Sequence, residues 1–121
     1  MKLKIVLAGL VSLMLLLTAC SKFGKVQKSK DIEYKLKMAD EYYAKKKYKY
    51  AQQLYEDLFP AYKGTQKFED IYYKYAYCFY YQKLYMDAEN LFKGYLEVFP
   101  NSSRAEEVDY MRAYSFYKQS P

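Results

Sequence analysis

Apolar and aromatic side chains recur at helical spacing throughout residues 31–121. Ala39, Tyr42 and Tyr43 stand at positions i, i+3 and i+4, which places all three on one face of a helix. Glycine and proline are sparse in this region, and their scarcity favours long helices over a sheet. The pattern therefore predicts an all-α fold, with helices over 31–46, 48–62, 66–82, 85–98 and 103–118.

Short polar segments separate these helices. The predicted turns include Lys45-Lys46-Lys47 and Gln82-Lys83. Gly64 suits the C-terminal cap of one helix, and Thr65 suits the N-cap of the next. Ser103 and Glu106 have the S-x-x-E spacing of a capping box, which predicts that the last helix begins there.

The first twenty residues have a different pattern, a basic start followed by an apolar run. Lys2 and Lys4 precede 13 uncharged residues from Ile5 to Leu17, and this run is shorter than the roughly 20 residues of a membrane-spanning helix. It ends in Leu17-Thr18-Ala19-Cys20, which resembles the lipobox of bacterial lipoproteins. The resemblance implies cleavage before Cys20 and acylation of that cysteine. The alternatives are an ordinary secretory signal with a chance cysteine, or a buried N-terminal helix.

These patterns divide the chain into a lipoprotein signal peptide over 1–19, a lipidated tether over 20–30 and a helical domain over 31–121. Ser21 replaces the aspartate of a typical inner-membrane retention signal, so we expect an outer-membrane anchor and a periplasmic location. An acylated Cys20 cannot pair with Cys78, which is then expected to be a small core residue. The tether lysines either stay solvated or are attracted to anionic lipid headgroups; they are Lys22, Lys25, Lys28 and Lys30.

The helical region repeats itself at an offset of 37 residues. Ala39 matches Ala76 and Ala113, and Tyr48 matches Tyr85. A small residue, an aromatic residue three later, a second small residue twelve after the first and an aromatic residue four beyond that resemble the tetratricopeptide (TPR) repeat. The second repeat fits this pattern best, with Ala76, Phe79, Ala88, Phe92 and Pro100 at the motif positions. The family's tryptophan position is filled by other residues: Lys35, Tyr72 and Asp109.

The resemblance implies a TPR-like α-solenoid of helical hairpins with about two and a half repeats. Stacked repeats usually need about three units and a capping helix for stability. The last helix has no partner helix, so Phe116 is expected to lack cover. We therefore expect the repeat domain to be truncated, or to be completed by another chain. A plain helical bundle is the alternative, although it would not require the 37-residue register.

Composition excludes most enzyme chemistry. The 121 residues suffice for one small domain, and 21% aromatic residues are too many for a disordered chain. Histidine is absent, which removes the imidazole base and His-ligated metals, and two cysteines are too few for a closed zinc site. The net charge of +6 comes almost entirely from lysine, which does not favour nucleic-acid recognition. We therefore predict a protein that is not an enzyme and takes no cofactor, metal, small-molecule substrate or nucleic acid.

A lipobox followed closely by TPR hairpins is similar to the BamD (YfiO) family of outer-membrane β-barrel assembly lipoproteins. Residues 51–58 resemble that family's A-x-x-L-Y-E segment, and residues 99–102 resemble its F/Y-P-x-S segment. The resemblance implies an outer-membrane scaffold that binds β-barrel assembly machinery subunits and unfolded outer-membrane proteins. The alternative is a periplasmic TPR accessory lipoprotein of the cell-wall or envelope-constriction machinery.

The resemblance also implies a peptide-binding groove along the first helix of each hairpin. Counting from the motif's small position gives nine candidate groove residues: Asp40, Tyr43, Tyr73, Tyr77, Tyr80, Tyr81, Tyr110, Tyr114 and Tyr117. Tyrosine offers large, rigid contact area with a polar tip, which suits an extended peptide with aromatic side chains. For Tyr73 and Tyr81, packing between hairpins is an equal alternative.

Overall fold

The computed structural model describes residues 2–121, and most of them are helical. Six α-helices follow one another, and none of the residues from 2 to 121 forms a strand. They are α1 (Lys2–Lys28), α2 (Ile32–Ala44), α3 (Tyr48–Tyr62), α4 (Lys67–Tyr81), α5 (Tyr85–Val98) and α6 (Ala105–Tyr117). The predicted all-α class is confirmed, and all five helices predicted over 31–118 are present. Met1, the first residue of the predicted signal peptide, lies outside the described residues.

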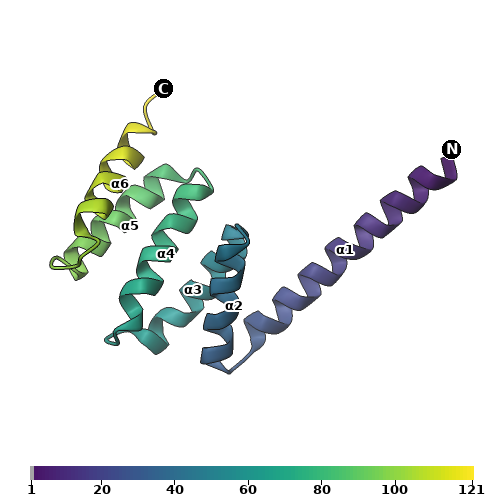
Figure 1. Cartoon of the computed structure of the whole chain (residues 1–121), viewed down its shortest axis with the longest axis horizontal. Helices are drawn as coiled ribbons and strands as arrows, with labels where there is room; N and C mark the ends of the chain where they lie inside the picture. The colour runs from purple at the N-terminus through teal and green to yellow at the C-terminus, as the bar shows by residue number, and fades with distance from the viewer. Residues whose placement is uncertain (1) are drawn as a thin grey trace.

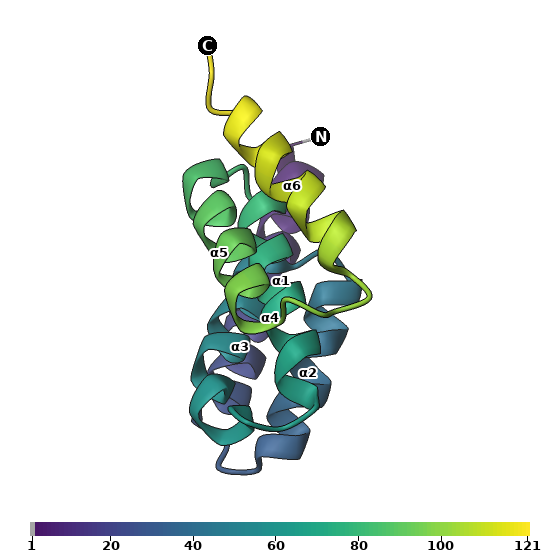
Figure 2. The same ribbon diagram turned by 90° about the vertical axis from the view of Figure 1, so that its left-hand side faces the viewer.

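Helices α2 to α6 form a stack in which each helix packs against its neighbours in sequence. Figure 1 shows successive helices running up and down, so that α2 with α3 and α4 with α5 form antiparallel hairpins. Figure 2 shows the same stack from its side, with α6 laid against α5. This arrangement is a TPR-like helical-repeat solenoid. The N-terminal part of α1 projects away from the stack.

Both turns inside the hairpins end the preceding helix in the same way. The N–H of Lys46 donates to the Tyr43 carbonyl at 3.0 Å, and the N–H of Lys47 donates to the Tyr42 carbonyl at 2.8 Å. These two bonds define a Schellman motif, whose left-handed residue is usually glycine. Here that residue is Lys46, with φ 62°, and the end of α4 repeats the motif with Lys83, at φ 64°.

The capping box predicted at Ser103 is wrong. Helix α6 begins at Ala105, and no side chain caps it. The N–H of Arg104 instead donates to the Ser102 hydroxyl oxygen at 3.0 Å. A tertiary contact explains the shift, because Ser102 is held by the carboxylate of Glu69 from α4.

The predicted N-cap at Thr65 is also wrong. The residue before α4 is Gln66, which makes no capping bond. The Thr65 hydroxyl donates instead to the Tyr62 carbonyl at 2.7 Å, a local bond that competes with capping. Gly64 lies just past the end of α3 with φ 85°, which fits its predicted role in ending that helix.

Small residues let the helices of each hairpin approach one another. The alanines of the repeat pattern in α2 to α5 are fully buried: Ala39, Ala51, Ala76 and Ala88. Tyr55 and Phe92, at the second aromatic position of each repeat, are also fully buried. In α6 the equivalent surface is open, since Ala113 is exposed and Phe116 is 63% exposed. The expectation that Phe116 lacks cover is confirmed.

The segment predicted as a tether is helical up to Lys28 and packs on the first hairpin. Phe23 and Val26, both in α1, are buried, and Val26 is only 1% exposed. The Phe23 ring stacks on Tyr50 of α3 at 4.3 Å between centroids and meets Tyr42 of α2 edge-on at 5.9 Å. Cys20 is therefore joined to the solenoid through a packed helical segment.

Gly94, inside α5, lies against a tyrosine of α4, and this contact supports a stability prediction. A Cβ at residue 94 would lie 2.2 Å from the hydroxyl oxygen of Tyr72 and 3.4 Å from its Cζ. The Tyr72 ring is held by the rings of Phe59, Phe68 and Phe99, so it cannot easily move aside. We expect Gly94→Ala to lower the free energy of unfolding by about 1–3 kcal/mol.

The control for this prediction is the same substitution in a Tyr72→Phe background. Without the hydroxyl, the nearest atom is at ordinary contact distance, and the helix preference for alanine should raise stability by about 0.5–1 kcal/mol. Urea unfolding followed by circular dichroism measures both effects. An equal loss of stability in the two backgrounds would show that the Tyr72 hydroxyl is not the cause.

Candidate functional site

The predicted groove residues are linked to one another by ring and polar contacts, and we call them the tyrosine band: Asp40, Tyr43, Tyr73, Tyr77, Tyr80, Tyr81, Tyr110, Tyr114 and Tyr117. Within α4 the rings of Tyr80 and Tyr81 meet at 5.6 Å between centroids, and Tyr80 links α4 to α6 through Tyr114 at 6.2 Å. Tyr43 of α2 joins the band through Tyr48, which stacks on Tyr81 at 4.6 Å. The structure therefore brings together tyrosines from three successive repeats.

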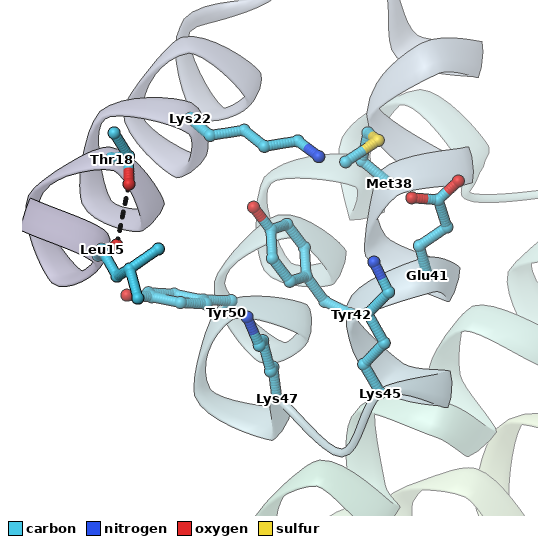
Figure 3. A pocket seen from close by; sticks show the side chains of 9 residues that line it. All are labelled: Leu15, Thr18, Lys22, Met38, Glu41, Tyr42, Lys45, Lys47 and Tyr50. Atoms are coloured by element: carbon cyan, nitrogen blue, oxygen red, sulfur yellow. Dashed lines mark hydrogen bonds between the residues drawn. The ribbon is translucent and has the colours of Figure 1, made fainter. Parts of the chain in front are cut away.

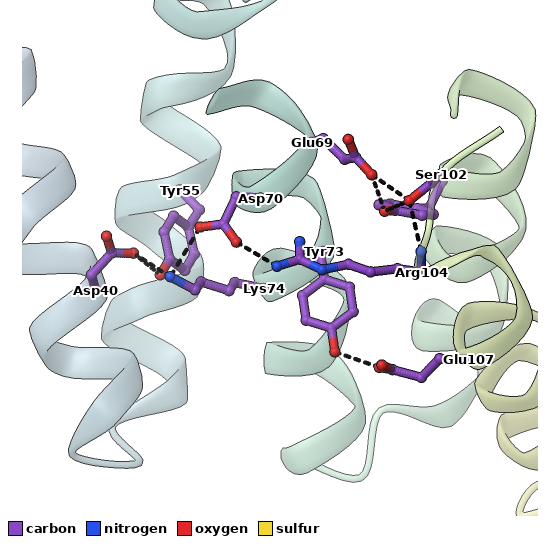
Figure 4. A network of polar contacts seen from close by, with 10 residues as sticks. Asp40, Tyr55, Glu69, Asp70, Tyr73, Lys74, Ser102, Arg104 and Glu107 are labelled. Atoms are coloured by element: carbon purple, nitrogen blue, oxygen red, sulfur yellow. Dashed lines mark hydrogen bonds and ion pairs between the residues drawn. The ribbon is translucent and has the colours of Figure 1, made fainter. Parts of the chain in front are cut away.

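Two members of the tyrosine band, Tyr73 and Tyr77, form hydrogen bonds that connect α4 to α6. Tyr73 and Tyr77 both donate hydrogen bonds to the carboxylate of Glu107 in α6, and Figure 4 shows the Tyr73 bond. Tyr77 is buried, and burial together with the Glu107 bond raises its pKa. The same causes raise the pKa of Tyr73 to about 12. The Arg104 guanidinium covers the Tyr73 ring at 4.2 Å. Tyr77 is thus unavailable to a ligand in this structure.

Asp40 belongs to a chain of polar contacts that crosses the repeats (Figure 4). It accepts a hydrogen bond from the Tyr55 hydroxyl at 2.6 Å and pairs with Lys74 at 3.2 Å. Lys74 also pairs with Asp70 at 3.0 Å, and Asp70 pairs with Arg104 at 3.1 Å. Each partly exposed pair contributes only about 0–1 kcal/mol. Together they connect α2, α4 and the start of α6, so Asp40 has a structural role in the band.

The accessible part of the band lies at its edge and on α6. The exposed fractions of Tyr81, Tyr110 and Tyr117 are 47%, 65% and 68%, and we call these three the outer tyrosines. On α6, the ring of Tyr114 stacks on Tyr110 at 6.0 Å and on Tyr117 at 5.9 Å. This exposed aromatic stack is able to contact a partner without any rearrangement of the fold.

Sequence reasoning missed two tyrosines and one acid of this surface. Tyr48 stacks on Tyr81, and Tyr85 meets Tyr80 edge-on at 5.6 Å. Both stand 37 residues apart at equivalent positions, so the repeat contained a signal for them. Glu107 gave no such signal, because its role depends on how α6 packs against α4.

A second polar cluster holds α5 and the α5–α6 loop against the start of α4. The Tyr95 hydroxyl donates to the Glu69 carboxylate at 2.7 Å, and the Ser102 hydroxyl donates to the same carboxylate. These two hydrogen bonds lower the pKa of Glu69 below its ordinary value. The cluster therefore favours a charged Glu69 at neutral pH and has a structural role.

The region around Cys20 contains a pocket of about 260 Å³ between α1 and the first hairpin. Figure 3 shows Lys22 extending from α1 toward α2, while Lys45 and Lys47 reach in from the α2–α3 turn. The Cys20 sulfur is exposed and lies 3.9 Å from the Tyr50 hydroxyl. The predicted lipidation site is thus accessible and lies beside the packed Phe23–Tyr50 pair.

Cys78 has the environment expected of a core residue. It is free and fully buried, and burial raises the pKa of its thiol to about 12. A thiol with so high a pKa is a poor nucleophile at neutral pH. Across residues 2–121, no group of three or more histidine, cysteine or acidic side chains is arranged to hold a metal ion.

By length and hydropathy, α1 qualifies as a membrane-crossing helix, and a signal sequence near the N-terminus meets the same criterion. None of the protein-family models matches the chain, and no curated protein matches it either.

Proposed function

We propose that this chain is a lipid-anchored TPR scaffold of the outer membrane, of the BamD type, which assists β-barrel assembly from the periplasmic side. The proposal is supported by the order of the sequence signals: a basic start, an apolar run, a lipobox-like segment ending at Cys20 and TPR hairpins. The exposed Cys20 and the apolar helix that precedes it fit this role.

The observation that carries the binding part of the proposal is the exposed aromatic stack on α6. Removing apolar aromatic surface from water is favourable, so exposed rings stacked side by side suit a partner that brings aromatic side chains of its own. The C-terminal strands of unfolded β-barrel proteins are the ligand we propose. Such strands are extended peptides, and the outer tyrosines offer them flat rings and hydroxyl groups for hydrogen bonds.

The test of peptide binding uses the outer tyrosines and leaves Tyr77 intact, because Tyr77 supports the fold. We expect the variant Tyr81→Ala/Tyr110→Ala/Tyr117→Ala to remain helical and to lose affinity for an aromatic-ended barrel peptide, by about 1–2 kcal/mol per anchoring ring. Fluorescence anisotropy with the detergent-solubilised full chain measures the affinity.

The matched control is Tyr34→Ala, which removes an exposed tyrosine from α2 outside the band. We expect it to bind the peptide as the unaltered chain does. Unchanged affinity in the folded triple variant would refute the tyrosine band as the peptide site.

A pull-down of the tagged lipoprotein from outer membranes tests the assembly role. Recovery of a barrel insertase supports that role, and recovery of cell-wall synthases would refute it.

A further inference from the structure

Exposed lysines gather where two turns of the solenoid meet one edge. Lys45, Lys46, Lys47 and Lys49 lie in or next to the α2–α3 turn, and Lys83 lies in the α4–α5 turn. We call these five residues the lysine edge. Both turns lie at the upper side of the stack in Figure 1, which is also the side toward which the N-terminal end of α1 projects.

The lysine edge lies beside the end of the apolar stretch of α1. One pocket brings Lys45 and Lys47 together with Leu15 and Thr18 of α1, and Lys22 contributes to the same pocket. A second pocket, of about 570 Å³, is lined by Leu16 together with lysines of the α2–α3 turn, Lys46, Lys47 and Lys49. Residues 15–18 belong to the segment that would be cleaved off, but the Cys20 sulfur itself lies 3.9 Å from the hydroxyl of Tyr50, the residue next to Lys49. The turn lysines are therefore at the level where an apolar helix, or the acyl chains on Cys20, would leave the membrane.

Charge at this level is strongly one-sided. Glu41 lines the first pocket with three lysines, and the described residues that line the second pocket include no acid. Asp87, in the first turn of α5, is the acidic neighbour of the α4–α5 turn. Positive charge thus dominates the part of the solenoid that faces residues 15–22 of α1.

Backbone conformation gives a second, independent observation. Lys46 and Lys83 both occupy the left-handed position of a Schellman motif, at φ 62° and 64°. Glycine is the residue that this position favours, because a side chain there is strained. Local stability therefore does not account for a lysine at either turn, and strained residues of this kind commonly have a functional role.

We propose that the lysine edge docks on the anionic phospholipid headgroups of the membrane that holds the Cys20 anchor. This inference rests on the lipid anchor of the proposed function. The solenoid then stands with its α2–α3 and α4–α5 turns against the membrane surface, and its opposite edge points away from it. Attraction to anionic headgroups makes each lysine near the surface about five-fold more populated in the headgroup-bound position than in solution.

Two of the tether lysines, Lys28 and Lys30, lie away from the lysine edge. Residues 20–28 are helical, so Lys28 lies about 12 Å along the helix from Cys20. Figure 1 places that end of α1 at the opposite edge of the stack from the α2–α3 turn. The sequence left open whether the tether lysines stay solvated or contact headgroups, whereas the proposal places the headgroup contact at Lys22 and the lysine edge.

Lysine acetylation of the processed, lipid-modified protein (residues 20–121) tests the proposal. The protein is reconstituted into vesicles of phosphatidylcholine alone or of phosphatidylcholine with phosphatidylglycerol, and a water-soluble acetylating reagent is followed by peptide mass spectrometry. We expect the lysine edge to react about five-fold more slowly in the anionic vesicles at low salt, and at the same rate in both vesicles at high salt. Lys30 and Lys63, away from this edge, serve as internal controls.

A variant that cannot fail by misfolding completes the test. Lys46→Gly/Lys83→Gly removes two charges and relieves both strained turns, so it should melt at a higher temperature while protection of Lys45, Lys47 and Lys49 falls. Lys63→Gln should leave that protection unchanged. Equal acetylation in both vesicles would overturn the proposal. Protection that is absent from both vesicles but present in native membranes would also overturn it, because an acidic protein would then be the partner. If the protein does not float with either vesicle in a density gradient, the lipid anchor is wrong as well.

Discussion

Replacing Cys20 with serine is expected to abolish lipid attachment and leave an uncut or soluble species. Each buried methylene of an acyl chain contributes about 0.8 kcal/mol, so several chains on one cysteine make the anchor effectively permanent. Serine cannot form the thioether that carries these chains. Incorporation of radiolabelled palmitate and fractionation of the envelope measure the loss.

The matched control for the anchor is Cys78→Ala, which removes the other thiol. Cys78 is fully buried in the core, so it is inaccessible to acylation and its replacement should leave labelling intact. Palmitate incorporation into Cys20→Ser at the level of the unaltered protein would contradict the lipobox interpretation and the anchor proposed from it.

Tyr95→Ala is expected to cause the largest loss of stability among substitutions in the second hairpin, about 3–5 kcal/mol of the free energy of unfolding. Tyr95 is fully buried, and its ring meets Tyr72 and Phe99 at 6.0 and 5.1 Å. Truncation would remove these contacts and take away one of the two hydrogen bonds donated to Glu69. Such a loss is large against the roughly 5–15 kcal/mol of a typical domain. Urea unfolding followed by circular dichroism measures it.

Tyr95→Phe separates the ring from the hydroxyl. It keeps the packing but leaves Glu69 with Ser102 as its remaining donor, and we expect a loss of about 1–3 kcal/mol. If Tyr95→Ala cost no more than Tyr95→Phe, the ring contacts would not stabilise the hairpin as the packing indicates.

Helix positions were predictable because the repeat supplies the same local signals more than once. The 37-residue offset aligned Ala39 with Ala76 and Lys46 with Lys83, and both pairs turned out to share the same burial or backbone conformation. The errors at Thr65 and Ser103 have different causes. The Thr65 hydroxyl donates to a carbonyl only three residues earlier, so its competing partner is local. At the start of α6 the hydroxyl that accepts from the backbone is that of Ser102, which Glu69 of α4 holds in place, and this tertiary partner is invisible to a local motif.

The candidate site was predictable only as a face. Counting along helices placed Tyr77 and Tyr81 on one surface, and the structure does connect their rings at 5.7 Å. Yet Tyr77 is buried and bonded to Glu107, whereas Tyr81 is 47% exposed. Helical periodicity assigns a side chain to one face of a helix. Whether that side chain is buried depends on other helices, and for Tyr77 the partner is Glu107, 30 residues further along the chain.

The sequence by itself determined the helical class, the repeat and the small and aromatic core positions, because all of these follow from spacing along the chain. Only the tertiary structure decided which tyrosines support the fold, that Phe23 and Val26 dock the end of α1 on the first hairpin, and that the turn lysines stand beside α1. These outcomes depend on side chains far apart in sequence meeting as the hairpins stack, and no local pattern specifies such a meeting.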